Sequence, residues 1–344
     1  MVRDLPTDDE CLDQIYSCSK DDLYIAETWG LHQASLPNLE AEFRELVEAG
    51  ILESDKFEDF RVIAEETGAL DKAFRGRFVQ FLKDKTLSFT GDDRNRLRGI
   101  PVGLLPSWEL NACAIQTPRG GVVIILNQGI IRHVTLIYRC ALAFMTWKDE
   151  EPFCRDAPQQ AYGGALIGLA QYAVTGDFSH VLHHRAGLVF PSLKSYENST
   201  ILFSLLMEIF ILLHEYGHVV KDHLSPDKVS PAFAGKLPNM HQYTKSQRQE
   251  FEADQYAIDR LSSKVVGRVQ PHDLAFAPGL VLKFLELCEC VAQRLNAPLP
   301  KTHPPAGARW ERIKMLTGLP NAKGSFVLRL EPAFDILIRS LQRA

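Results

Sequence analysis

A strongly apolar run, Ile201 to Leu213, most constrains what this chain can fold into. The run spans 13 residues and includes Glu208, whereas a membrane-spanning helix needs about 20 apolar residues. We therefore predict a helix buried in a globular core, and no membrane span. Because the run leads directly into His214 and His218, the same helix is expected to carry ionisable side chains that need partners when buried.

The composition fits a globular protein and argues against nucleic acid as a partner. The chain has 344 residues, of which 46% are hydrophobic and 24% charged, which is ordinary for a folded protein of more than one average domain. The formal net charge is −5, and no basic cluster of the kind that binds duplex DNA stands out.

The N-terminus and the cysteines predict a cytoplasmic location. The first ten residues are acidic and contain no apolar segment of a secretory signal. Seven cysteines are an odd number, and their scattered spacing does not suggest a disulfide framework. Cys288 and Cys290 form a C-x-C pair within an apolar helical pattern, where two buried thiols are favoured over a metal site.

Hydrophobic periodicity predicts a mostly α chain (α+β) with a small β-sheet. Residues 1–95 are interpreted as a helical N-terminal extension and residues 96–344 as the main domain, with residues 92–98 as a polar linker. One hairpin is predicted, with strands at Ala112–Gln116 and Val122–Leu126. Residues 176–200 read as irregular, and helices are expected near 37–47, 56–66, 70–82, 130–147, 160–174, 201–223, 246–262, 277–295 and 333–343.

The sequence His214-Glu215-Tyr216-Gly217-His218 is an H-E-x-x-H motif. On a helix, residues four apart lie on one face, so both imidazoles can reach one zinc ion. Glu215 lies beside them and can accept a proton from water activated by the metal. We therefore predict a zinc site at the end of the apolar helix.

Catalytic zinc keeps three protein ligands, and two candidates for the third follow the motif. His223 lies five residues after His218, one short of the metzincin spacing, and Lys221 stands where that pattern has glycine. Glu250 lies in a segment with helical spacing and shares a helix face with Asp254. Glu252 points elsewhere on the same helix and is expected to be solvated.

H-E-x-x-H followed by Glu250-x-x-Ala253-Asp254 resembles the gluzincins, and among them the family of the CAAX prenyl endopeptidases and the bacterial heat-shock membrane protease. The resemblance implies a zincin-like metallopeptidase domain in which Glu250 is the third zinc ligand. It also implies that Asp254 orients His214. The transmembrane helices of that family are absent here. A weaker, architectural similarity is to H-E-x-x-H peptidases of bacterial phage-exclusion and stress systems.

Thr302-His303-Pro304-Pro305, followed by Arg309, resembles a further segment of that family. His303 is assigned a catalytic role in stabilising a developing oxyanion, and Arg309 a supporting role beside the zinc. The alternative is that both side chains only hold the Pro-Pro turn. Arg312, Tyr243 and the residues of His183-His184-Arg185 are weaker candidates, for which exposed or packing roles are favoured.

The predicted function is a zinc-dependent endopeptidase that acts on a protein or peptide substrate, with Glu215 as general base. The substrate is expected to lie extended along an edge strand, with Val122 to Leu126 as the candidate. One alternative is a catalytically silent zincin-fold sensor, against which the intact Glu215 argues. Another is a latent protease whose zinc is covered by residues 176–200, or by the N-terminal helices, until a regulatory protein partner removes them.

Overall fold

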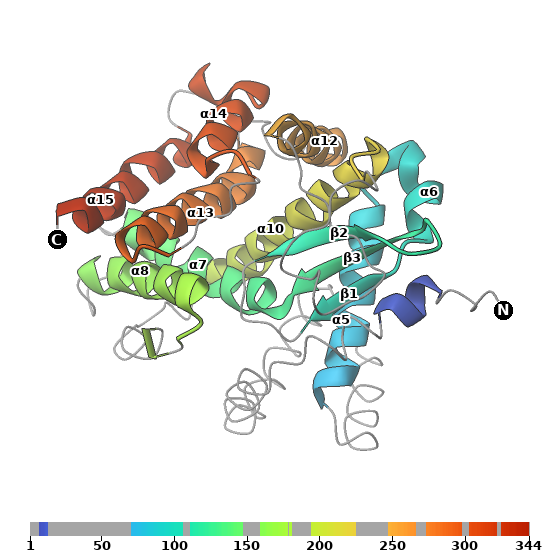
Figure 1. Ribbon diagram of the computed structural model, residues 1–344. Coiled ribbons are helices and arrows are strands. Elements are labelled where there is room, and N and C mark those ends of the chain that lie inside the picture. The colour runs from blue at the N-terminus through green and yellow to red at the C-terminus, as the bar shows by residue number, and fades with distance from the viewer. Residues whose placement is uncertain are drawn as a thin grey trace.

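The computed structural model describes residues 7–12, 70–105, 111–146, 159–177, 179–180, 194–224, 247–265, 273–297, 303–321 and 325–343. These residues are mostly helical, with one small three-stranded sheet beside the longest helix (Figure 1). The predicted fold class is therefore confirmed.

Helices longer than one turn lie at or near most of the predicted positions. Those named in Figure 1 are α5 (Leu70–Leu87), α6 (Arg94–Arg98), α7 (Gln128–Thr146), α8 (Gln159–Thr175), α10 (Lys194–Val220), α12 (Gln247–Val265), α13 (Phe276–Arg294), α14 (Ala306–Leu316) and α15 (Leu330–Arg343). α14 was not predicted, because its short amphipathic pattern directly follows a Pro-Pro turn. The helices expected near 37–47 and 56–66 lie outside the described residues.

The sheet consists of β1 (Val102–Leu105), β2 (Ala112–Gln116) and β3 (Val122–Asn127) in the order β1-β3-β2. The predicted hairpin is confirmed, since β2 and β3 pair antiparallel. β1, which pairs parallel with β3, was not predicted. The choice of Val122 to Leu126 as the substrate strand is wrong, because β3 is the central strand and its backbone groups are used on both sides. β2 is an edge strand and packs against α10.

Alternate side chains of the sheet enter two separate hydrophobic clusters. Ile124 and Leu126 of β3 belong to the main core, while Val123 and Ile125 join a smaller cluster with Cys11. The one-turn helix within residues 7–12 therefore covers the face of the sheet opposite the main core. The division of the chain between residues 95 and 96 stays a prediction.

α10 is the central element of the main core. It packs against α5, α7, α12, α13 and β2, and it extends seven residues further toward the N-terminus than predicted, into the segment read as irregular. Residues Ser199–Val220 are long and apolar enough to cross a membrane by length and composition, but 67% of the most apolar window is buried inside the fold. The apolar helix is thus longer than the sequence run suggested, and its burial is that of a core helix.

Residues 92–98 form a structural element, so their interpretation as a linker is wrong. Leu97 of α6 is fully buried, and Asp93 accepts hydrogen bonds from Tyr256 and Arg260 of α12. Arg96 donates to the carbonyl oxygens of Val219 and Val220 at the end of α10. The polar side chains that suggested a linker instead fasten this segment to α10 and α12.

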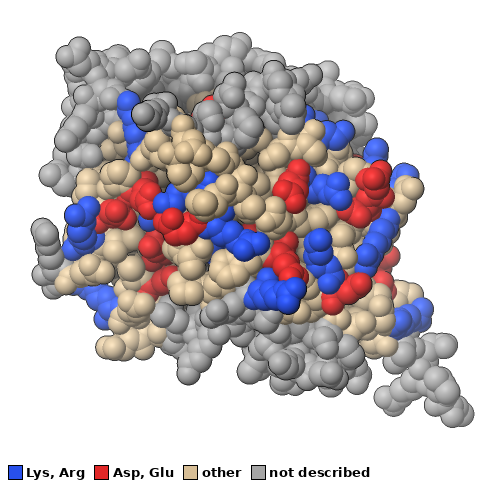
Figure 2. All heavy atoms as spheres, turned by 90° about the horizontal axis from the view of Figure 1, so that it is seen from above, with Lys and Arg blue, Asp and Glu red and all other residues tan. Residues whose placement is uncertain are grey.

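Acidic and basic side chains alternate over the molecular face seen in Figure 2, and no patch of one sign dominates its described part. Opposite charges also pair within the described residues, as where Lys314 contacts Glu311 and Glu331. The expectation that nucleic acid is not a partner depends on composition alone and stays a prediction.

Candidate metal centre

The C-terminal part of α10 presents His214, Glu215 and His218 inside the fold. All three are buried, with 7%, 3% and 0% of each residue exposed. The Nε2 atoms of the two histidines lie 3.1 Å apart, because residues four apart on a helix share a face. The predicted approach of the two imidazoles is therefore present in the fold.

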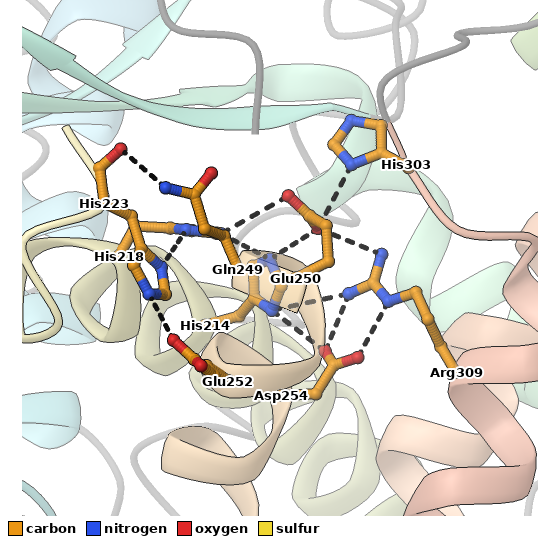
Figure 3. Close-up of polar contacts among 9 residues, drawn as sticks. All are labelled: His214, His218, His223, Gln249, Glu250, Glu252, Asp254, His303 and Arg309. Carbon is orange, nitrogen blue, oxygen red and sulfur yellow. Dashed lines mark hydrogen bonds and ion pairs between the residues drawn. The ribbon is translucent and has the colours of Figure 1, made fainter. Parts of the chain in front are cut away.

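α12 brings the carboxylate of Glu250 to the same point (Figure 3). Its Oε2 lies 3.3 Å from Nε2 of His214, and its Oε1 lies 3.6 Å from Nε2 of His218. Ligands held at 2.0–2.1 Å around a tetrahedral zinc ion are about 3.3 Å apart. Among the described residues, these three side chains are the one group that could hold a metal ion. Two imidazoles and a carboxylate are a donor set that fits zinc.

The close approach of α10 and α12 depends on two small residues. A Cβ atom added at Gly217 would lie 2.9 Å from Cα and 3.1 Å from the carbonyl oxygen of Ala253. No side chain fits between the helices at this point, so the backbones can approach far enough for Glu250 to reach the histidines. The glycine inside the H-E-x-x-H motif and the alanine inside the second motif thus form one contact.

Asp254, one turn after Glu250, holds the other nitrogen of His214. Its Oδ1 lies 2.9 Å from Nδ1 of His214, and both of its oxygens accept hydrogen bonds from Arg309, at 2.8 Å from Nε and 2.7 Å from Nη2. Nη1 of Arg309 also lies 3.5 Å from Oε2 of Glu250. A bidentate guanidinium fixes the plane of the carboxylate, and the carboxylate in turn orients the imidazole.

α14 delivers Arg309 because its first turn is anchored to α13. The helix begins directly after Pro305, and Oε1 of Glu289 accepts a hydrogen bond of 3.0 Å from the backbone nitrogen of Ala306. A carboxylate at this position satisfies an N-terminal amide and suits the helix dipole. Arg309 follows one turn later and points inward.

Burial and ion pairing shift the pKa values of Asp254 and Arg309 in opposite directions. Burial alone would raise the pKa of Asp254, but the charge of Arg309 and the hydrogen bonds from Arg309 and His214 lower it to about 2. Burial would lower the pKa of Arg309, which Asp254, Glu250 and Glu215 together raise. Asp254 is therefore an ionised carboxylate, and Arg309 supplies positive charge to a site with several acidic groups.

His303 approaches the site from the turn before α14. Its Nδ1 lies 3.1 Å from Oε2 of Glu250, and 39% of its side chain is exposed (Figure 3). It is thus the most accessible side chain next to the three candidate ligands.

A group of contacts that the sequence did not predict lies behind His218. Nδ1 of His223 lies 3.0 Å from Nδ1 of His218, and Nε2 of His223 lies 2.9 Å from Oε2 of Glu252. Glu252 also accepts a hydrogen bond from Arg248, and its pKa is lowered by the bonds from Arg248 and His223. Glu252 was expected to be solvated, and its side chain is 34% exposed, but its contact with His223 was not predicted.

The remaining candidates lie away from the centre or outside the described residues. The guanidinium of Arg312 lies over the ring of Phe251, 5.5 Å from its centroid, so Arg309 rather than Arg312 reaches the site. Cys288 and Cys290 are free thiols, but both are only partly buried rather than buried as predicted. Tyr243 and the segment 183–185 lie outside the described residues.

Comparison with known proteins supports a peptidase. Residues 193–328 match the model of the family Peptidase U49, and this range contains every side chain placed in the site above. No curated protein and no solved structure matches the chain significantly.

Proposed function

We propose that this protein is a zinc-dependent endopeptidase and that His214, His218 and Glu250 hold the metal. The observation that carries the proposal is the buried convergence of these three side chains beside Glu215. The match to a peptidase family over the same residues supports the reaction class. A purely structural site would not need the buried carboxylate of Glu215 next to the ligands.

The chain's own residues then have distinct tasks. A bound zinc ion would act as a Lewis acid that polarises the scissile carbonyl and lowers the pKa of the attacking water. Glu215 accepts the proton of this water and later delivers it to the leaving amine. His303, whose side chain is 39% exposed, donates a hydrogen bond to the developing oxyanion. Arg309 and Asp254 keep His214 in a fixed orientation.

A peptidase acts on protein or peptide substrates, and we propose that the substrate binds as an extended strand along β2. In the described fold β2 pairs on one side with β3 and packs against α10, the helix that carries the histidines. Backbone pairing with an edge strand binds a peptide without selecting its side chains. Specificity would then arise from the side chains around the scissile bond.

The cytoplasmic location and a regulatory protein partner remain proposals. Free thiols at Cys140, Cys288 and Cys290 support a reducing compartment. A latent state is tested by adding candidate partners to the purified protein and measuring hydrolysis.

The decisive experiment for the proposed function is Glu215→Gln. We expect this variant to keep its zinc, because Glu215 is not among the converging ligands, and to lose hydrolysis of an unfolded protein substrate. Glu311→Gln, on an exposed position of α14, is the matched control and is expected to cleave normally. Wild-type hydrolysis by Glu215→Gln would reject the general-base role. Zinc binding without hydrolysis by the wild type under every condition would favour the silent sensor.

A further inference from the structure

We propose that His223 is a positioning residue for His218, and that Glu252 completes the chain of contacts that holds it. The inference rests on the proposed metal centre, since it assigns a task to side chains behind one of its ligands. It adds to the site two residues that no motif marks. Figure 3 shows the chain running from His218 through His223 to Glu252 on the side away from Arg309.

The positions of the two ring nitrogens of His218 determine which one faces the metal site and which one carries the proton. Its Nε2 faces Nε2 of His214 at 3.1 Å and Oε1 of Glu250 at 3.6 Å, which makes it the metal-facing nitrogen. A neutral imidazole that ligates through Nε2 carries its proton on Nδ1. That proton is then donated to Nδ1 of His223, 3.0 Å away.

The contact between His223 and Glu252 requires the same arrangement of protons. Because Nδ1 of His223 accepts from His218, the proton of His223 resides on Nε2. Nε2 donates it to Oε2 of Glu252 at 2.9 Å, and an ionised carboxylate can only accept. Glu252 therefore selects the tautomer of His223, and His223 selects the tautomer of His218 that leaves Nε2 free for a metal.

The end of α10 places His223 over His218. Asp222 has a left-handed backbone conformation with φ of 53°, which aspartate tolerates better than most residues. The backbone nitrogen of His223 donates to the carbonyl of His218 at 2.9 Å, and that of Asp222 donates to Val219 at 3.2 Å. These two bonds form a Schellman motif, which turns the chain back over the last helical turn.

Arg96 strengthens this turn from outside. Its guanidinium donates to the carboxylate of Asp222 at 2.8 Å and to the carbonyl of Val219 at 3.0 Å. The side chain of His223 is consequently buried, with 5% of the residue exposed, and its ring lies 5.1 Å from that of His218 between centroids. The helix end thus provides a rigid support for a ligand.

The test compares zinc affinity, measured by competition with a chromogenic chelator, across variants of this chain. Loss of such a supporting contact typically weakens metal binding by 10–100-fold, and we expect this range for His223→Ala. His223→Asn should recover most of the affinity, because the amide oxygen of asparagine can accept the hydrogen bond of His218 in place of Nδ1. Glu252→Gln should cause a smaller loss. Gln255→Ala, on the same helix with its side chain donating to Asp259, is the control and should bind zinc normally.

A second readout uses the zinc-free protein and identifies the tautomer directly. Histidine side-chain ¹⁵N shifts should report the Nδ1–H form of His218 in the wild type and in His223→Asn, and a mixture of tautomers in His223→Ala. Unchanged affinity and an unchanged tautomer in a folded His223→Ala variant would overturn the inference. Equal loss of zinc in His223→Ala, His223→Asn and Glu250→Ala would overturn it as well, since His223 would then be a ligand. Absence of zinc binding in the wild type would reject the metal centre itself, while the tautomer measurement would still report on the contact.

Discussion

The two histidines of α10 are held from behind by two different kinds of structure. Behind His214 lie Asp254 and Arg309, a buried ion pair from two other helices. Behind His218 lies His223, an imidazole from the turn that ends α10 itself, backed by Glu252, whose side chain is 34% exposed. One proposed ligand depends on long-range packing of charges, and the other on a local turn with access to solvent.

The difference suggests that two equivalent proposed ligands need not lose the same stability when their supporting contacts are removed. A buried ion pair that loses one partner leaves an uncompensated charge in the core. Loss of the His223 contact should destabilise the fold less, because water can reach Glu252 and solvate its carboxylate. The predictions below use this asymmetry and run from the largest expected effect to the smallest.

Asp254→Ala is expected to have the largest effect. It leaves the buried guanidinium of Arg309 without its main partner, and breaking such a pair costs about 3–5 kcal/mol. Zinc affinity should fall by about 10–100-fold as well. Chemical unfolding and chelator competition measure the two losses. In the double variant Asp254→Leu/Arg309→Met, stability should recover while zinc affinity stays low. A stable Asp254→Ala protein would remove the proposed asymmetry.

Glu208 shows what burial does to a carboxyl group that has no partner among the described residues. Burial raises its pKa to about 8, whereas partners lower that of Asp254 to about 2. A raised folded pKa stabilises the protein fully below about pH 4.5, and this contribution is lost as the pH rises toward 8. At pH 7 the cost is about 3 kcal/mol. We expect Glu208→Gln to be more stable than the wild type at pH 7 and not at pH 4.5. Equal stability of the two proteins at both pH values in urea unfolding would contradict the assignment.

Gly217→Ala should lower both the stability of the fold and the zinc affinity, because the added Cβ meets the backbone of Ala253. Overpacking of this kind costs about 1–3 kcal/mol, and separation of α10 from α12 draws Glu250 and Asp254 away from the histidines. Thermal unfolding and zinc content measure the effect. Gly99→Ala, where an added Cβ has nothing within 4 Å, is the control. Normal zinc binding by Gly217→Ala would show that the helix spacing is not limiting.

Arg248→Ala tests the outermost member of the His218 side and should have the smallest effect. Its side chain is 87% exposed, and exposed ion pairs contribute about 0–1 kcal/mol. We expect zinc affinity to stay within about twofold of the wild type. A tenfold loss in the chelator assay would mean that the exposed end of the chain is as important as the buried ion pair.

Local sequence patterns predicted the helices and strands that carry the site. They did not predict contacts that form only when two elements pack against each other. The hairpin and the helices of both motifs follow from alternation and helical spacing. The pairing of Gly217 with Ala253 is a contact between two helices, which no single helix pattern contains. His223 was considered only as a ligand, because its position depends on the left-handed conformation of Asp222. An aspartate after a helix can indicate such a left-handed turn. That indication can be used only when the last residue of the helix is already known.

The most direct test of the central claim is X-ray absorption spectroscopy of the zinc-loaded wild-type protein at the zinc edge. The geometry of His214, His218 and Glu250 predicts two imidazole ligands, at least one carboxylate oxygen and no sulfur, with zinc–nitrogen distances of about 2.0–2.1 Å. Glu250→Gln should change the oxygen contribution and leave both imidazoles in place. A third imidazole or a thiolate in the zinc shell of the wild type would contradict the ligand set.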